Sequence, residues 1–206
     1  MNRFIKILIS TCVLCAGVFA QAQTDEYKKN EFFVGYSHQR IDDGNFSGAN
    51  GAEFSYVRNI HKYFGIKADV SGAFRSNKFE TSFTDASGNI NTFRINSRRQ
   101  VYNFLGGIQV KNNKTDARFK PFAHALAGVA VNHSSNDVSC LSTTCTVPVG
   151  AFPFTNTNFS MAVGGGLDIK INDKIDFRAI QVDYNPIFNL GSVRNNVRFG
   201  IGFVFK

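Results

Sequence analysis

Two cysteines in a polar stretch are the residue pair whose type and spacing most directly offer chemistry. Cys140 and Cys145 flank the short segment Leu-Ser-Thr-Thr. In an oxidising compartment such a pair forms a disulfide that closes a small loop. The alternative is a metal site that uses both thiols with His133, but the sequence offers no obvious fourth ligand. We therefore predict a disulfide and no metal site.

Charged residues at alternate positions of otherwise apolar segments are the second chemical feature. Lys67, Asp69 and Ser71 alternate with Ala68 and Val70. Residues two apart in a strand share a face, so the polar set lies on one side, which we predict to be the inside of a barrel. The same alternation elsewhere gives an inward network with acids and bases in equal number: Glu53, Lys67, Asp69, Asp168, Lys170, Arg178, Asp183 and Arg198. Balanced charges favour ion pairs that plug the lumen over a pore selective for one sign of ion.

Segments with this two-residue period supply the elements that must position these charges. We find eight, each near the roughly ten residues that a tilted strand needs to cross the hydrocarbon layer. The connections alternate between long and short, so four outer loops interleave with three inner turns. The predicted fold is all-β: an eight-stranded antiparallel up-and-down transmembrane β-barrel with four long outer loops and three short periplasmic turns. The segments lie near residues 31–40, 51–60, 64–75, 99–110, 119–132, 157–171, 174–185 and 196–205.

Two of these segments depart from plain alternation. The seventh changes phase, and a bulge near Ala179 and Ile180 restores the alternation and places Arg178, Gln181 and Asp183 inside. In the fifth segment neither face is plainly polar, so its facing stays open.

The first residues of the chain are typical of a secretory signal peptide. Arg3 and Lys6 precede an uncharged apolar run that is shorter than the ~20 residues of a spanning helix, and residues 20–22 fit small-x-small before a cleavage site. We predict that residues 1–22 are removed and that residues 23–206 form one barrel domain. Export makes nucleic acid an unexpected partner for this chain of net charge +8, and lipid phosphates are the available counterions.

The last segment carries a second targeting feature. It alternates apolar residues with small or polar ones up to the end of the chain. Arg198, Gly200, Phe203 and Phe205 resemble the C-terminal signal by which the barrel-assembly machinery recognises bacterial outer-membrane barrels. Lys206 departs from that pattern, which usually stops on the aromatic residue.

The chain resembles the OmpA-like outer-membrane barrel family, including its OmpX-like relatives. The resemblance rests on the predicted signal peptide, the alternating segments, the outer loops and the terminal signal. The resemblance covers essentially the whole mature chain. It implies a monomer in the outer membrane of a two-membrane bacterium, in contact with lipid and lipopolysaccharide, with no cofactor. It also implies a structural or adhesive role carried by the outer loops and no catalysis. Because the chain ends with its eighth strand, we expect no wall-binding domain.

Two predicted loops offer binding chemistry. Residues 76–98 carry several basic side chains that suit lipopolysaccharide phosphates, although a plain solvated loop has the same composition. Residues 133–156 hold the cysteine pair and an apolar run, which lies either against a partner, in the headgroup zone or over the barrel mouth. Our hypothesis is that residues 139–153 form the adhesive tip.

Three other functions remain as alternatives. A small passive porin-like channel is the first. A soluble ligand-binding barrel is the second, but it requires the reverse facing of charged and apolar residues. The third is a lipid A-modifying hydrolase: His133-Ser134-Ser135-Asn136 is similar to the His-x-Ser-Asn motif of lipid A deacylases. That resemblance implies Ser135 as nucleophile, His133 as base and Asn136 as oxyanion donor, but the carboxylate that should orient the histidine is not evident. We predict that the protein is not an enzyme.

Overall fold

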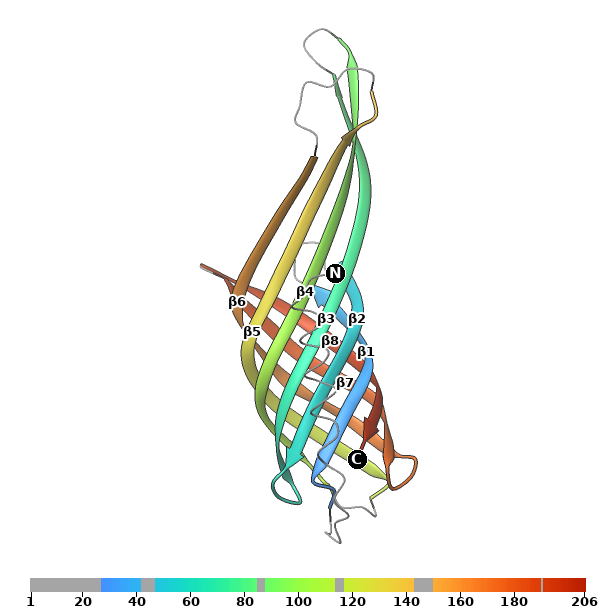
Figure 1. Cartoon of the computed structure of the whole chain (residues 1–206), viewed down its shortest axis with the longest axis vertical. Helices are drawn as coiled ribbons and strands as arrows, with labels where there is room; N and C mark the ends of the chain where they lie inside the picture. The colour runs from blue at the N-terminus through green and yellow to red at the C-terminus, as the bar shows by residue number, and fades with distance from the viewer. Residues whose placement is uncertain (1–26, 42–46, 85–87, 114–116, 143–149, 190) are drawn as a thin grey trace, which may run out of the picture.

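A closed barrel of eight antiparallel strands forms the whole of the described structure (Figure 1). The computed structural model describes residues 27–41, 47–84, 88–113, 117–142, 150–189 and 191–206. Each strand pairs with the next one in sequence, and β1 pairs with β8, so the predicted fold class is confirmed. The strands are β1 (Asn30–Ile41), β2 (Ser47–Asn59), β3 (Phe64–Thr84), β4 (Ile90–Lys111), β5 (Phe119–Cys140), β6 (Gly150–Lys170), β7 (Ile175–Asn189) and β8 (Ser192–Phe205).

Closure of the sheet is what allows this chain to cross lipid. The β1–β8 ladder runs from Phe32 opposite Phe205 to Arg40 opposite Val197, so neither strand leaves an open edge there. Each unpaired backbone group costs roughly several kcal/mol in hydrocarbon, and a closed barrel leaves no unpaired backbone groups along its wall. Among the described residues, no helix is long and apolar enough to cross a membrane.

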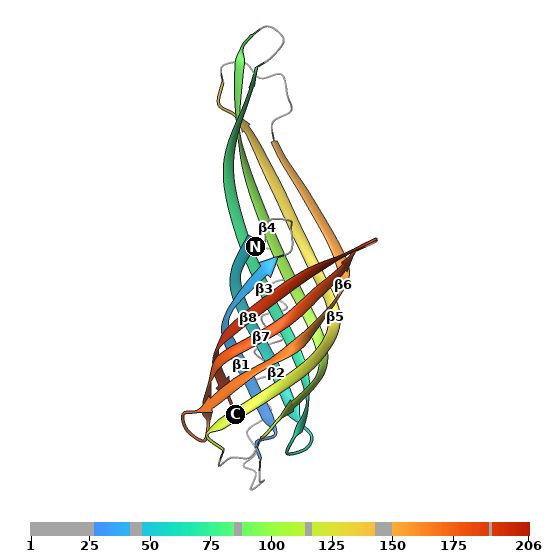
Figure 2. The ribbon, with the colours of Figure 1, turned by 180° about the vertical axis from the view of Figure 1, so that it is seen from behind.

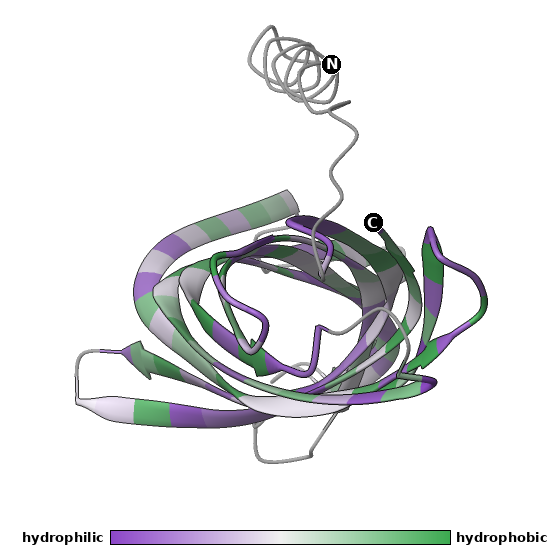
Figure 3. Cartoon of the chain, turned by 90° about the horizontal axis from the view of Figure 1, so that it is seen from below, coloured by the Kyte–Doolittle hydropathy of each residue, from purple (hydrophilic) through white to green (hydrophobic). Residues whose placement is uncertain are grey.

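The wall has an apolar outside and a mostly polar inside, and bands of both kinds alternate along each strand (Figure 3). In β3, Ile66 and Val70 are exposed to the outside, whereas Lys67 and Asp69 are buried in the lumen. In β5, whose facing the sequence left open, Pro121 and Ala123 face outward and the alternate set faces inward. That inward set is Phe122, His124 and Leu126.

The phase change in β7 is a β-bulge at the predicted place. Arg178 lies opposite Gly202 of β8, but the next paired residue, Gln181, lies opposite Gly200. The register against β6 shifts at the same point. One extra residue therefore separates two inward side chains, and both Arg178 and Gln181 are buried.

Strands β3 to β6 continue well beyond the barrel wall, which corrects the predicted extent of the outer loops (Figures 1 and 2). Most of residues 76–98, expected as a loop, is a paired hairpin that runs from Ser76 opposite Arg98 to Thr84 opposite Ile90. Likewise, Val138 of β5 lies opposite Gly150 of β6. Both faces of residues 76–84 are exposed, so the period-two signal that marks a strand in the sequence is absent there.

The opposite end of the barrel has the three short turns that were predicted, at residues 60–63, 112–118 and 171–174. Two of them are closed by backbone hydrogen bonds, from Ile60 to Phe64 (2.9 Å) and from Ile171 to Ile175 (3.1 Å). Short turns are typical of the periplasmic end of outer-membrane barrels, so we expect the projecting sheet of β3 to β6 on the cell-surface side.

Depth in the membrane sets the cost of a charge on the outer wall. Val70 lies near the middle of the β2–β3 ladder, so Val70→Arg is expected to lower the free energy of unfolding by about 2–4 kcal/mol. Phe64→Arg, at the strand end, should cost about 0–1 kcal/mol. Urea unfolding in phosphatidylcholine vesicles, followed by heat-modifiable gel mobility, measures both. Equal costs would place these residues off the lipid surface.

Candidate functional site

Arg198 is the centre of the ion pairs in the middle of the lumen. Its Nη1 donates to Asp69 Oδ1 (2.8 Å) and its Nη2 donates to Asp183 Oδ2 (2.7 Å). Its Nε lies 3.6 Å from Glu53 Oε2. These partners come from β2, β3 and β7, so one guanidinium from β8 ties together strands on several sides of the barrel.

Lys67 and His124 complete this central group. Lys67 Nζ lies 3.3 Å from Asp69 Oδ2 and 3.8 Å from Glu53 Oε1. It also lies 3.3 Å from Nδ1 of His124, whose Nε2 is 2.8 Å from Asp183 Oδ1. All of these side chains have lost contact with solvent.

Arg178 organises a second group nearer the periplasmic end. Its Nε donates to Asp168 Oδ1 (2.8 Å) and its Nη2 donates to Asp168 Oδ2 (3.1 Å), a bidentate pair. Lys111 Nζ donates to Asp168 Oδ2 (3.1 Å) and to Glu31 Oε2 (2.5 Å). Two acids and two bases therefore balance at this level.

Aromatic rings cover both faces of the Arg178 guanidinium. Its central carbon lies 4.3 Å from the ring centre of Phe33 and 4.1 Å from that of Phe122. Glycines make room for these rings: a Cβ at Gly166 would lie 2.9 Å from the Phe122 ring, and one at Gly202 would lie 3.0 Å from that of Phe33. A desolvated cation between two rings adds a cation–π attraction to the ion pair.

Gln181 joins the two groups into one network. Its side-chain oxygen accepts a hydrogen bond from Arg178 Nη1 (2.7 Å). Its Nε2 donates to Glu53 Oε1 (2.8 Å) and to Asp183 Oδ2 (2.7 Å). Because the β7 bulge puts both Arg178 and Gln181 inside, the bulge is the backbone feature that makes this connection.

An apolar layer lies in the lumen on the surface side of the ion pairs. It consists of buried side chains contributed by six strands, namely Ile41, Ala49, Ala73, Val101, Ala130 and Ile187. A smaller buried group, Leu105, Leu126 and Ala162, also lies in the lumen.

The predicted network residues fall in these groups, with one exception. Lys170 is half-buried at the periplasmic mouth, where its Nζ lies 2.6 Å from Oδ1 of the exposed Asp173. This hydrogen bond from Lys170 holds the pKa of Asp173 below its usual value. Lys170 therefore belongs to the mouth, because the strand reaches the end of the wall at this residue.

Several lumen residues were missed by the sequence alternation. Glu31 begins the first segment and was not assigned to the inside, and Lys111 lay one residue past the predicted end of the fourth. Lys120 and His124 lie in the segment whose facing was open. Asp176 at the periplasmic end accepts from Lys206 (2.5 Å) and lies 3.5 Å from Lys120.

The four residues of the predicted insertion signal are placed on both faces of β8. Arg198 and Gly200 face the lumen, while Phe203 and Phe205 are exposed on the lipid side. Their recognition by an assembly machinery stays a prediction. The predicted signal peptide, residues 1–22, lies outside the described residues and stays a prediction.

The other chemical candidates lie in the projecting sheet. Cys140 ends β5, and Cys145 lies outside the described residues, so their disulfide also stays a prediction. His133 Nδ1 is hydrogen bonded to Thr155 Oγ1 of β6 (2.7 Å). Within the described part of the chain, no group of three metal-ligating residues is close enough to hold an ion.

Removal of Arg198 tests how strongly the network stabilises the barrel. Arg198→Ala is expected to lower the free energy of unfolding by about 3–5 kcal/mol, because it leaves buried carboxylates without their cation. Arg94→Ala is the control: its pair with Glu80 (2.8 Å) is half-exposed and should cost no more than about 1 kcal/mol. Urea unfolding in vesicles gives both values. A cost for Arg198→Ala as small as the control's would contradict a central role.

Solved structures of known proteins share this fold. No curated protein matches the chain. Ail, the attachment invasion locus protein of Yersinia pestis, superposes with a TM-score of 0.51 at 14% identity, covering 85% of this chain and 97% of Ail. Ail in complex with the heparin analogue sucrose octasulfate gives 0.50 at 16% identity, over the same shares of the two chains. Neisserial surface protein A gives 0.50 at 13% identity, covering 88% and 99%.

These solved structures resemble the chain in fold alone, because their sequence identities are low. The family follows from a sequence match over nearly the whole chain. The family model of the outer membrane protein beta-barrel domain matches residues 9–206. Members of such a family lie in the outer membrane of Gram-negative bacteria. The closed antiparallel topology and the apolar outer wall agree with this family match, which spans nearly the whole chain. The chain belongs to the outer membrane protein beta-barrel domain family.

Proposed function

We propose that this protein is a closed outer-membrane barrel that attaches to anionic glycans through the inner face of its projecting β3–β6 sheet. The observation that carries the proposal is a pair of arginines, Arg75 and Arg99, directly opposite each other on that face. It has no catalytic role in this proposal. The lumen serves as a rigid support.

The inner face of the projecting sheet is defined by the strand register. Cross-strand partners share a face, and alternate residues continue the lumen side of each strand. Four large aromatic side chains on this face are between 42% and 63% exposed: Phe79, Phe83, Phe152 and Phe154. Phe83 also stacks on the buried Phe93 ring, with centres 5.4 Å apart. Exposed apolar surface of this extent is typical of a binding site.

The arginine pair gives this face its charge. Arg75 and Arg99 lie opposite each other in the β3–β4 ladder, so two guanidinium groups come from neighbouring strands at one level of this face. The same row of the sheet continues through Ser134 to Phe154. A guanidinium fork matches a sulfate or phosphate group, and aromatic rings pack against the apolar faces of sugars.

The outer face of the projecting sheet supports anion binding less well. Arg94 donates to Glu80 through both Nε (3.0 Å) and Nη2 (2.8 Å). Arg98 lies 3.7 Å from Asp137. Contacts between these bases and lipopolysaccharide phosphates stay a proposal, and they would compete with carboxylates already in place.

The likeness to Ail supports the class of ligand. Ail has been solved with a heparin analogue, which is a sulfated sugar, and its name records attachment. The proposed adhesive tip at residues 139–153 adjoins the same inner face, although residues 143–149 lie outside the described residues. Ion pairs and an apolar layer in the lumen support a closed barrel over a passive channel.

Binding to immobilised heparin tests this proposal. We expect the double substitution Arg75→Ser and Arg99→Ser to weaken heparin binding at least about tenfold and to lower the salt concentration of elution, because two charge-assisted contacts are lost. Arg58→Ser is the matched control, since it removes an exposed arginine at the periplasmic end. Wild-type elution unchanged by the double substitution, or no retention of the wild type, would contradict the proposal.

A further inference from the structure

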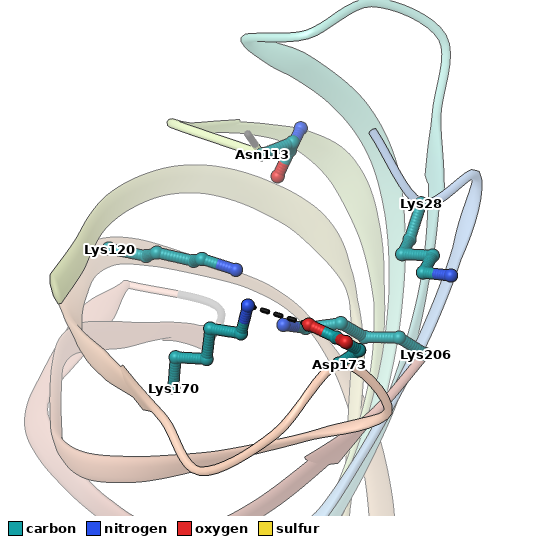
Figure 4. A pocket seen from close by; sticks show the side chains of 6 residues that line it. All are labelled: Lys28, Asn113, Lys120, Lys170, Asp173 and Lys206. Atoms are coloured by element: carbon teal, nitrogen blue, oxygen red, sulfur yellow. Dashed lines mark ion pairs between the residues drawn. The ribbon is translucent and has the colours of Figure 1, made fainter. Parts of the chain in front are cut away.

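A cluster of lysines meets at the periplasmic mouth of the barrel and is not explained by attachment at the cell surface. We call it the mouth pocket; its lining consists of Lys28, Asn113, Lys120, Lys170, Asp173 and Lys206. In Figure 4 the ammonium groups of Lys120, Lys170 and Lys206 are turned toward one another, and Lys28 lies at the rim. We propose that the mouth pocket binds a phosphate-bearing anion.

The charge of the pocket is the first argument. Four ammonium groups line the pocket. In the described part of the chain, two carboxylates lie within pairing distance of three of them: Asp173 beside Lys170, and Asp176 beside Lys206 and Lys120. The next groups inward, around Lys111 and Arg178, are balanced by Glu31 and Asp168. A phosphate group carries about −1.5 to −2 charges at neutral pH, so this cluster of ammonium groups attracts it.

The backbone around the pocket is fixed, which is the second argument. The Lys28 carbonyl accepts a hydrogen bond from Asn59 Nδ2 (2.8 Å), and the Lys206 N–H donates to the Lys174 carbonyl (2.9 Å). The Lys170 N–H donates to the Arg118 carbonyl (2.8 Å). Lysines that repel one another are thus held together by the closure of the barrel, so an anion gains from their field without first assembling them.

Asn113 adds a polar group that suits a protonated phosphate oxygen. Its side chain is only 4% exposed, and its Oδ1 is buried without a hydrogen-bond partner in the described structure. The oxygen is turned toward the pocket in Figure 4. Because a buried acceptor without a partner costs free energy, a donor such as the hydroxyl of hydrogen phosphate is favoured there.

Two sources offer this chemistry at the periplasmic mouth: a free phosphate or phosphorylated solute, and a phospholipid headgroup of the inner leaflet. NMR of the purified protein in phospholipid-free dodecyl maltoside distinguishes them. Inorganic phosphate replaces chloride at constant ionic strength in one titration, and dihexanoyl phosphatidic acid is added in a second. The backbone amides of Asn113, Lys120 and Lys206 report binding. A saturable shift with phosphate assigns a free anion, and a shift with the lipid alone assigns a headgroup.

Lysine variants show whether the shift belongs to the pocket. Lys28→Gln and Lys120→Gln should each weaken binding at least about tenfold, since each removes a charge-assisted contact. Lys28 precedes β1, so its variant leaves the wall intact. Lys62→Gln, in a turn at the same end, should bind like the wild type. Heat-modifiable mobility checks folding. The proposal is overturned if neither ligand gives a saturable shift, or if the Lys28→Gln and Lys120→Gln variants bind as tightly as wild type.

Discussion

Ionised groups enclosed by a narrow barrel must be paired, and this constraint organises the molecule from the inside. Outside the wall is hydrocarbon, and the bore holds little water, so a buried charge without a partner costs several kcal/mol, roughly. Arg198 and Arg178 meet this constraint by binding carboxylates from facing strands. The β7 bulge and the Gln181 amide then join the two sets of ion pairs into one network.

The same constraint explains residues that make no ion pair themselves. Glycines at positions 166 and 202 leave space for the rings that cover Arg178. The apolar layer around Val101 and Ile187 lies in the lumen where the charges end, which is the basis of the proposed closed barrel. The binding chemistry that we propose lies at the two ends of the barrel: an arginine pair among aromatic residues on the surface side, and a cluster of lysines at the periplasmic mouth.

Strand number, antiparallel order, short turns and the β7 bulge could be predicted from the sequence because lipid on one side and a polar lumen on the other impose a strict two-residue period. Where that contrast weakens, prediction weakens with it. Inward Phe122 and Leu126 are as apolar as the residues beside them, since they pack against Arg178 and the apolar lumen groups. Residues 76–84 of the projecting hairpin are exposed on both faces, so this arm resembled a loop. Lys111 and Lys120 sit at strand ends, where boundaries are hardest to place, and their partners are distant in sequence.

A single-channel recording of the purified protein in a planar lipid bilayer tests the closed lumen most directly. With the ion pairs and the apolar layer in place, the wild-type barrel should show no steady discrete conductance steps. Steady steps whose size changes when Lys67 or Asp69 is neutralised would contradict the account, because ions would then be passing along the network.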